Sequence, residues 1–181
     1  PNLWLSYLSI AAGLKGYGST VVNACASGTV AIGNAFSMIQ TGQADVMLAG
    51  ATSSKLAAPY LSGYSRLGMI SPSDSPDNAM RPFDKDRTGF VLGEGACVLV
   101  LEEAKHAEKR QAEPISRIVG TGMTMDAFRV TDPSEEGKIR AMQQAMANAG
   151  IDEKAIDYVN AHATYTKAND AAETQAIKSL F

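Results

Sequence analysis

Cysteine is scarce in this sequence. Only Cys25 and Cys97 occur among 181 residues, and neither belongs to a CxxC pair. Two distant thiols cannot form a disulfide framework, and they lack the ligand spacing of a zinc centre or a dithiol redox site. We therefore expect a reducing, cytoplasmic setting and no metal site.

An excess of charge of one sign is also lacking, because 16 basic side chains stand against 19 acidic ones. Nucleic-acid binding needs Lys and Arg concentrated on one face, so we expect no nucleic-acid partner. The longest charge-free stretch, residues 16–44, is interrupted by Asn23, Asn34, Gln40 and several glycines. A membrane-spanning helix needs about 20 predominantly apolar residues. We therefore predict a buried strand and a buried helix there, and no membrane association.

The sequence has no initiator methionine and no basic-then-apolar leader. It begins with Pro-Asn-Leu and stops within or just after a predicted helix, so we expect a chain cut from a longer one, without a secretory signal. Its length and its 45% of apolar residues suffice for one domain or slightly more.

Short apolar strands alternate with helices along the chain. Strands are predicted at residues 21–22, 45–50, 90–102, 115–121 and 156–160, and helices at 28–42, 103–111, 132–150 and 170–181. Residues 52–69 are predicted as helix and loop. The helix at 132–150 would begin with a capping box from Asp132 to Glu135, with Pro133 at its first position, and end at Gly150. This alternation indicates an α/β fold with a mostly parallel or mixed sheet.

Cys25 lies where the first predicted strand joins the first long helix. A following helix would direct its N-terminal amides at the sulfur and favour the nucleophilic thiolate. The small neighbours Ala24, Ala26 and Gly28 permit the sharp turn that would expose it. An inert buried cysteine is the alternative, because free cysteines are among the most buried residues. Cys97, within the run Ala-Cys-Val-Leu-Val-Leu, fits that alternative.

His162 directly follows the predicted strand at 156–160, where the functional groups of α/β sheets usually lie. Both a structural and a catalytic histidine fit that place. His106 lies in a charged, solvated helix, and we expect no functional role for it. Cys25 and His162 together favour acyl transfer through a thiol nucleophile.

Three further polar features have structural explanations. Asp170 and Glu173 have the spacing of a capping box. Residues 84–87 (Asp-Lys-Asp-Arg) predict a charged turn with local ion pairs, which could brace a site. The Gly-Glu-Gly at residues 93–95 is too weak a signal for a phosphate-binding loop.

Five ordered blocks carry a resemblance to a known family. They are residues 23–28 (Asn-Ala-Cys-Ala-Ser-Gly), 44–50 (Ala-Asp-Val-Met-Leu-Ala-Gly), 81–87 (Arg-Pro-Phe-Asp-Lys-Asp-Arg), 89–96 (Gly-Phe-Val-Leu-Gly-Glu-Gly-Ala) and 158–162 (Tyr-Val-Asn-Ala-His). The chain resembles a β-ketoacyl synthase of the thiolase-like superfamily, most closely the stand-alone elongating condensing enzymes of fatty-acid, polyketide and polyene synthesis. The resemblance implies a layered α/β/α/β/α fold, with residues 1–125 in the later part of the N-terminal thiolase-like half and residues 126–181 at the start of the C-terminal half.

The resemblance also implies roles for five residues. Cys25 matches the acylated nucleophile, and His162 matches the first of two active-site histidines. Thr164 and Thr166 match threonines that contact the phosphopantetheine arm of an acyl carrier protein, and Asp126 matches a loop acid near the active-site entrance. The second histidine, a structural lysine and a glycine-rich gating loop would follow the last residue. No metal or bound cofactor is implied, because the substrates are carried on phosphopantetheine.

The implied reaction is a decarboxylating Claisen condensation of an acyl group on Cys25 with a malonyl thioester on acyl carrier protein. The implied assembly is a dimer, homodimeric or with a related subunit, with the strand at 45–50 near the two-fold axis. Two alternatives stay open: a non-catalytic chain-length-factor subunit and a coenzyme-A-dependent thiolase-like enzyme. Cys25 and His162 disfavour the first, and the blocks at 81–84 and 160–164 disfavour the second. This architecture further implies that residues 1–181 alone would leave the strands near Val21 and Ile156 without sheet neighbours.

Several residues depart from the family pattern. Ala163 stands where glycine is usual, Tyr165 and Lys167 replace serine and proline, Asn169 stands where glycine is common, and Arg129 stands where histidine is frequent. We expect the changes at Ala163, Tyr165, Lys167 and Asn169 to crowd and charge the mouth of the pantetheine channel. They favour a specialised polyketide or polyene synthase, while acyl chain length and carrier specificity stay open.

Overall fold

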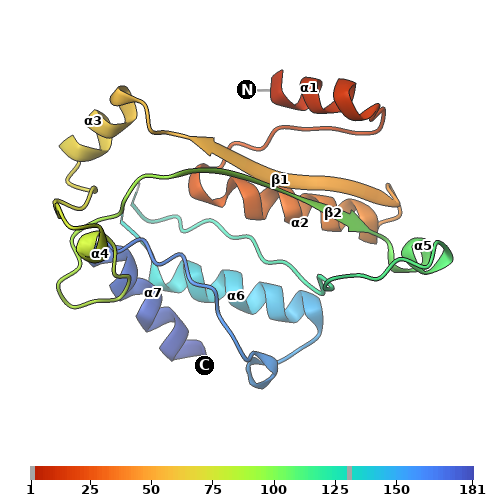
Figure 1. The fold of residues 1–181 in the computed structure, drawn as a ribbon. Coiled ribbons are helices and arrows are strands. Elements are labelled where there is room, and N and C mark those ends of the chain that lie inside the picture. The colour runs from red at the N-terminus through yellow and green to blue at the C-terminus, as the bar shows by residue number, and fades with distance from the viewer. Residues whose placement is uncertain (1–2, 130–131) are drawn as a thin grey trace. The chain divides into compact units, whose positions relative to one another are not determined.

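The computed structural model describes residues 3–129 and 132–181. Two compact units divide them. The first comprises the residues up to Thr52 together with Ala96–Ser116, and the second comprises Ser53–Gly95 together with Arg117–Phe181. Helices and strands occur together along the chain (Figure 1), so the predicted α/β class is confirmed.

The first unit is built on two paired strands, β1 (Val46–Ser54) and β2 (Glu94–Glu102), which run in opposite directions (Figure 1). A Cβ on Gly50 would meet the carbonyl oxygen of Cys97 at 2.1 Å, so only glycine permits this approach of the strands. Helix α2 (Ser27–Gln40) packs on β1, where a Cβ on Gly28 would lie 3.0 Å from that of Ala51. Small residues therefore set the spacing of helix and strand.

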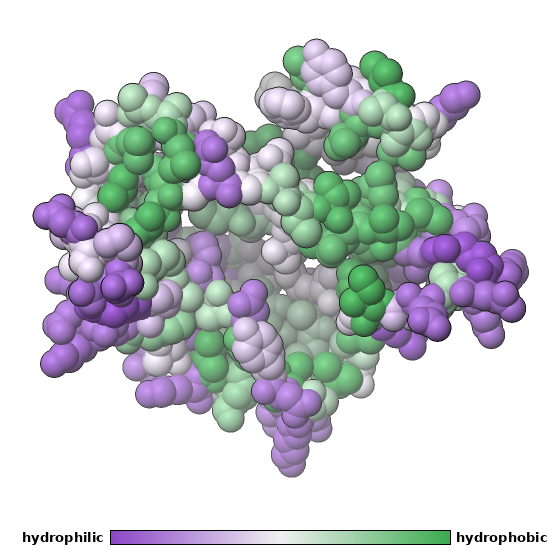
Figure 2. Space-filling model, in the orientation of Figure 1, coloured by the Kyte–Doolittle hydropathy of each residue, from purple (hydrophilic) through white to green (hydrophobic). Residues whose placement is uncertain are grey.

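The predicted strands at 45–50 and 90–102 are confirmed with shifted ends, since β1 runs on to Ser54 and β2 begins at Glu94. Their predicted burial is wrong. Val98 is 52% and Val100 66% exposed, and Cys97 is exposed as well. The reason is that within the described residues no second layer covers the faces of β2. Figure 2 shows large apolar areas on the molecular surface.

The remaining helices of the first unit are α1 (Leu3–Ala12) and α5 (Ala104–Lys109). Helix α5 is tied to the end of β2 through Glu102. Arg110 Nε donates to the Glu102 carboxylate at 2.8 Å, and His106 Nδ1 lies against the same group. The hydrogen bonds from Arg110 and then from His106 lower the pKa of Glu102 from 4.5 to about 2. This cluster explains His106 as a helix anchor.

The second unit contains the helices α3 (Ala58–Arg66), α4 (Pro76–Ala79), α6 (Glu135–Ala149) and α7 (Lys167–Leu180), together with a parallel bridge between Ile70 and Phe90. Helices α6 and α7 pack together. The chain before α6 runs in close contact with the backbone of that helix. A Cβ on Gly122 would lie only 2.0 Å from the carbonyl oxygen of Ala141. Two short 3₁₀ turns also occur, Ala24–Ala26 in the first unit and Glu153–Ala155 in the second.

The ends of α6 and α7 correct two predictions. Helix α6 is capped by Ser134, whose hydroxyl accepts the Gly137 amide, so Pro133 precedes the cap rather than opening the helix. Its predicted end at Gly150 is confirmed, with φ +70°. Helix α7 begins at Lys167 rather than at residue 170, so Asp170 lies inside the helix and no capping box forms there.

The predicted strands at residues 21–22, 115–121 and 156–160 are wrong as strands. These segments do not form strands, because a strand requires a hydrogen-bonded neighbouring strand. In residues 3–129 and 132–181 the only paired strands are β1 and β2. Over the same residues, no helix has the length and apolarity needed to cross a bilayer.

Candidate active site

Cys25 lies in a tight turn immediately before α2. Asn23 has φ −141° and ψ 47°, Ala24 takes the left-handed conformation with φ +46°, and the 3₁₀ turn Ala24–Ala26 then leads into the helix. The Ser27 hydroxyl fixes this turn, because its Oγ accepts the Asn23 amide and donates to the Ala24 carbonyl oxygen, both at 2.8 Å. The thiol is exposed, with the N-terminus of a 14-residue helix directly behind it.

The two cysteines do not differ in exposure. Cys97 lies on β2 and is exposed, against the prediction of a buried thiol. What distinguishes Cys25 is its place at a helix N-terminus, where the backbone amides carry partial positive charge. The strained Ala24 conformation also belongs to this turn, and strained backbone of this kind is concentrated at functional sites.

His162 belongs to the second unit, on the loop that precedes α7, and its side chain is exposed. The loop is held from behind by Glu173 of α7. Glu173 Oε1 accepts the His162 amide at 2.8 Å and Oε2 accepts the Ala163 amide at 2.9 Å. Ala163 has φ +50°, a conformation that glycine adopts more easily. The carboxylate therefore stabilises a backbone that the alanine side chain disfavours.

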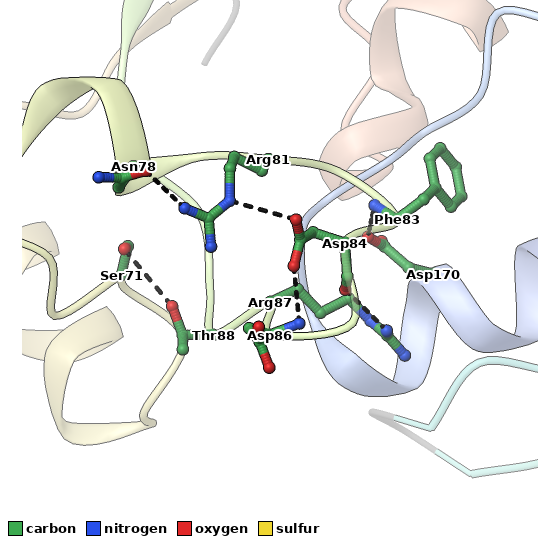
Figure 3. Close-up of polar contacts among 9 residues, drawn as sticks. All are labelled: Ser71, Asn78, Arg81, Phe83, Asp84, Asp86, Arg87, Thr88 and Asp170. Carbon is green, nitrogen blue, oxygen red and sulfur yellow. Dashed lines mark hydrogen bonds and ion pairs between the residues drawn. The ribbon is translucent and has the colours of Figure 1, made fainter.

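Asp170 holds the next part of the same loop. It is 1% exposed, and its Oδ1 accepts the amide of the buried Tyr165 at 3.1 Å. Its Oδ2 accepts the amide of Phe83 at 2.9 Å (Figure 3). Tyr165 and Phe83 have φ +62° and +65°. Asp170 and Glu173 thus bind the amides of three non-glycine residues in left-handed conformations, Phe83, Ala163 and Tyr165.

Thr164 and Thr166 project their hydroxyls toward each other, with the two Oγ1 atoms 2.8 Å apart. Thr166 is the N-cap residue of α7. Arg87 binds this helix start, donating from Nε to the Thr166 carbonyl oxygen at 3.2 Å and from Nη2 to that of Lys167 at 2.8 Å. The hydroxyl pair therefore lies on a segment fixed on both sides.

Asn169 joins this network. Its side-chain nitrogen lies 3.4 Å from both Asp170 Oδ1 and Glu173 Oε2, and its oxygen accepts from Lys138 Nζ of α6 at 3.2 Å. Asn169 thereby links a cation on α6 to the two carboxylates under the His162 loop.

Asp126 lies against the first turn of α6. A Cβ on Gly137 would meet Asp126 Oδ1 at 1.8 Å, so the aspartate occupies the space that this glycine leaves. Arg129 pairs with Asp132 at 2.9 Å and lies over the ring of Phe128, at 5.6 Å from its centroid. The structure thus brings His162, Thr164 and Thr166 onto one loop, while Asp126 lies at the start of α6 and Cys25 belongs to the first unit.

Sequence reasoning missed the residues that hold the loop. The spacing of Asp170 and Glu173 predicted a capping box, yet both carboxylates bind amides outside α7. For Arg87 the signal was present, because residues 84–87 were interpreted as a possible brace. The expected ion pairs within residues 84–87 are not among those of the described residues; Asp84 Oδ2 pairs instead with Arg81 Nε, three residues earlier, at 3.3 Å (Figure 3).

Comparison with known proteins identifies the family of this chain. The model of the β-ketoacyl synthase N-terminal domain matches residues 2–107, and that of the C-terminal domain matches residues 115–181. The chain therefore belongs to the β-ketoacyl synthase family. The predicted boundary between residues 125 and 126 stays a prediction.

Three relatives illustrate the likeness. The mitochondrial 3-oxoacyl-[acyl-carrier-protein] synthase of Arabidopsis thaliana is 46% identical over 99% of the chain and 40% of that protein. A β-ketoacyl synthase from Burkholderia phymatum superposes with a TM-score of 0.96 at 41% identity, covering 100% of this chain and 44% of that one. A type II polyketide ketosynthase, solved with its acyl-carrier protein and bound to the hexaketide, gives a TM-score of 0.93 at 31% identity, covering 97% and 44%. The expected thiolase-like fold is confirmed, and the chain spans less than half the length of these relatives.

Proposed function

We propose that the intact protein is a β-ketoacyl-[acyl-carrier-protein] synthase, an acyltransferase that performs a decarboxylating Claisen condensation. The Cys25 thiolate attacks the acyl thioester on the carrier, the S–acyl bond forms, and the carrier thiol leaves. The malonyl thioester then loses carbon dioxide, and its carbanion attacks the acyl carbon and displaces Cys25. The observation that carries this proposal is the exposed Cys25 on a fixed turn at the start of α2.

The same turn supplies electrostatic stabilisation. The Cys25 backbone amide would form part of the oxyanion hole, and one such donor contributes about 3 to 4 kcal/mol in other acyl-transfer sites. Left-handed Ala24 and helical Ser27 flank this peptide unit. Rigid donors of this kind need no reorganisation as charge develops.

His162 would stabilise the enolate formed on decarboxylation. Its backbone is fixed by Glu173, which leaves the imidazole as the exposed group of the loop. Thr164 and Thr166 would donate hydroxyl hydrogen bonds to the amide carbonyls of a phosphopantetheine arm. Asp126 would lie near the entrance, as the resemblance implies. An acyl carrier protein is the partner that this chemistry requires, and one relative's structure contains such a pair.

The alternatives are weaker. A chain-length-factor subunit has no need of an activated thiol, whereas Cys25 is exposed at a helix N-terminus. A coenzyme-A-dependent thiolase-like enzyme is disfavoured by the relatives, because the Arabidopsis protein is named for acyl-carrier-protein substrates. Pairing with a second copy or a related subunit belongs to the proposal, and the apolar helix α1, which has no buried residue, supports it.

Separate measurement of the two half-reactions tests the proposal. His162→Ala should reduce malonyl decarboxylation by about two orders of magnitude, while acyl transfer to Cys25 falls much less, since the helix dipole and not a histidine activates the thiol. His106→Ala on α5 is the matched control and should change neither rate. Equal loss of both half-reactions in His162→Ala would contradict the proposed role, and wild-type protein without acyl transfer would refute the function.

A further inference from the structure

Arg87 directs its guanidinium at main-chain carbonyl groups. Nη1 donates to the Asp84 carbonyl oxygen at 3.1 Å, Nε to that of Thr166 at 3.2 Å, and Nη2 to that of Lys167 at 2.8 Å. None of the ion pairs within residues 3–129 and 132–181 involves Arg87. Its planar fork therefore joins two chain segments rather than neutralising a carboxylate.

The position of these carbonyls is unusual for a cation. Thr166 and Lys167 are the N-cap and the first residue of α7, and the partial positive charge of a helix N-terminus opposes a guanidinium nearby. Helix electrostatics thus do not explain Arg87. The hydrogen bonds to the carbonyl groups explain the position of Arg87. The Thr166 oxygen accepts both the Arg87 Nε–H and the Asp170 amide at 3.2 Å, so it is held by two donors.

A second hydrogen bond joins the same two segments, and again the donor lies in residues 83–87. The Phe83 amide donates to Asp170 Oδ2 at 2.9 Å, with Phe83 held at φ +65° (Figure 3). Residues 83–87 therefore donate from one backbone amide and one guanidinium to the loop and first turn of α7. The Arg81–Asp84 ion pair supports this turn from within.

We propose that Arg87 is a positioning residue that sets the hydroxyl pair of Thr164 and Thr166 for the pantetheine arm of the substrate. The hydroxyls lie 2.8 Å apart on a backbone with left-handed residues at Ala163 and Tyr165, a conformation that needs outside support. Arg87 supplies that support at Thr166 itself. This role rests on the proposed function, because it takes the thioester arm as the ligand of the two threonines.

The test compares Arg87→Met and Arg87→Lys in the intact protein, with Lys85→Met, an exposed residue of the same turn, as control. Arg87→Met should raise KM for malonyl carrier protein about tenfold with a smaller change in kcat, because misplacement of binding groups weakens substrate positioning. Arg87→Lys should recover little of this loss, since one ammonium cannot serve three carbonyls in a fixed fork. If Arg87→Met does not fold, Arg87→Lys carries the comparison.

Two further measurements separate this role from a merely structural one and from the proposed function. Alkylation of Cys25 by iodoacetamide should be unchanged in Arg87→Lys, and hydrogen exchange should rise at residues 162–168 without a general increase. An unchanged KM, or an equal rise in Lys85→Met, would overturn the proposal, as would unaltered exchange at 162–168. If the wild-type protein lacks malonyl decarboxylation, the proposed function fails, while the exchange measurement still decides whether Arg87 fixes the loop.

Discussion

Ala163 donates its backbone amide to Glu173 Oε2 at 2.9 Å while its own φ is +50°. The Glu173 carboxylate stabilises the strained backbone of Ala163, because its hydrogen bond helps to hold a conformation that costs an L-residue about 1 to 2 kcal/mol. The loop that carries His162 is thus kept in place by side chains of the following helix.

Ala163→Gly should leave the melting temperature unchanged or raise it, because glycine adopts a positive φ without a steric cost. Ala161, two residues earlier, has no positive φ, so Ala161→Gly relieves no strain. It should lower the free energy of unfolding by about 0.5 to 1 kcal/mol. Thermal unfolding of both variants checks the difference in sign. Equal destabilisation by the two substitutions would contradict the strain at Ala163.

Glu173→Gln should destabilise the protein by about 1 to 3 kcal/mol, because only one of its two acceptor oxygens remains for the two amides. Hydrogen exchange at His162 and Ala163 should rise together with the loss of stability. Glu153→Gln, on the exposed 3₁₀ turn Glu153–Ala155, is the control and should have little effect. Protected amides in Glu173→Gln would show that other groups hold the loop.

Ser27→Ala should loosen the turn at Cys25, since one hydroxyl fixes both the Asn23 amide and the Ala24 carbonyl. The alkylation rate of Cys25 should fall, with a stability loss of about 1 kcal/mol. Ser37→Ala removes a hydroxyl bonded to the Gly33 carbonyl on the same helix and should leave the alkylation rate unaltered. A rate unchanged in Ser27→Ala would mean that the turn forms without its hydroxyl.

Glu102 makes a pH-dependent contribution to stability. Its folded-state pKa of about 2 lies below the 4.5 of the free side chain, so the contribution is complete above the higher value and is lost as the pH falls through the lower one. The gap in melting temperature between wild type and Glu102→Gln should therefore shrink from pH 5 toward about pH 2. Glu108→Gln, exposed on α5, should give no such trend. A constant gap for Glu102→Gln would contradict the lowered pKa.

The fold could be predicted from the sequence where the information is local. The helix at Ser27–Gln40 and the end of α6 at Gly150 follow from apolar periodicity and from glycine at a left-handed position. The segments at 115–121 and 156–160 were predicted as strands from composition alone, but pairing depends on a neighbour that local sequence does not specify. The predicted burial of Cys97 was wrong for a related reason, because burial depends on which other elements pack over the strand, and local sequence does not specify that.

The reactive residues of the candidate site could be predicted from the sequence, but the residues that hold its loop in place could not. Cys25 and His162 were found from their places beside predicted elements. The partners of Asp170 could not be found, since Phe83 is distant in sequence and spacing within a helix identifies a shared face rather than what that face contacts. Tyr165 and Ala163 were noticed as departures, but only the structure shows that both need left-handed backbone.

The most direct test of the proposed function is to identify the thiol that becomes acylated. The intact protein is incubated with acyl carrier protein bearing an acyl thioester, and the acylated peptide is identified by mass spectrometry, with Cys25→Ala and Cys97→Ala as matched variants. Both thiols are exposed, so accessibility alone would label the two alike. We predict acylation at Cys25 in the wild type and in Cys97→Ala, and none in Cys25→Ala, because only Cys25 lies at a helix N-terminus. Acylation at Cys97 alone would contradict the assignment.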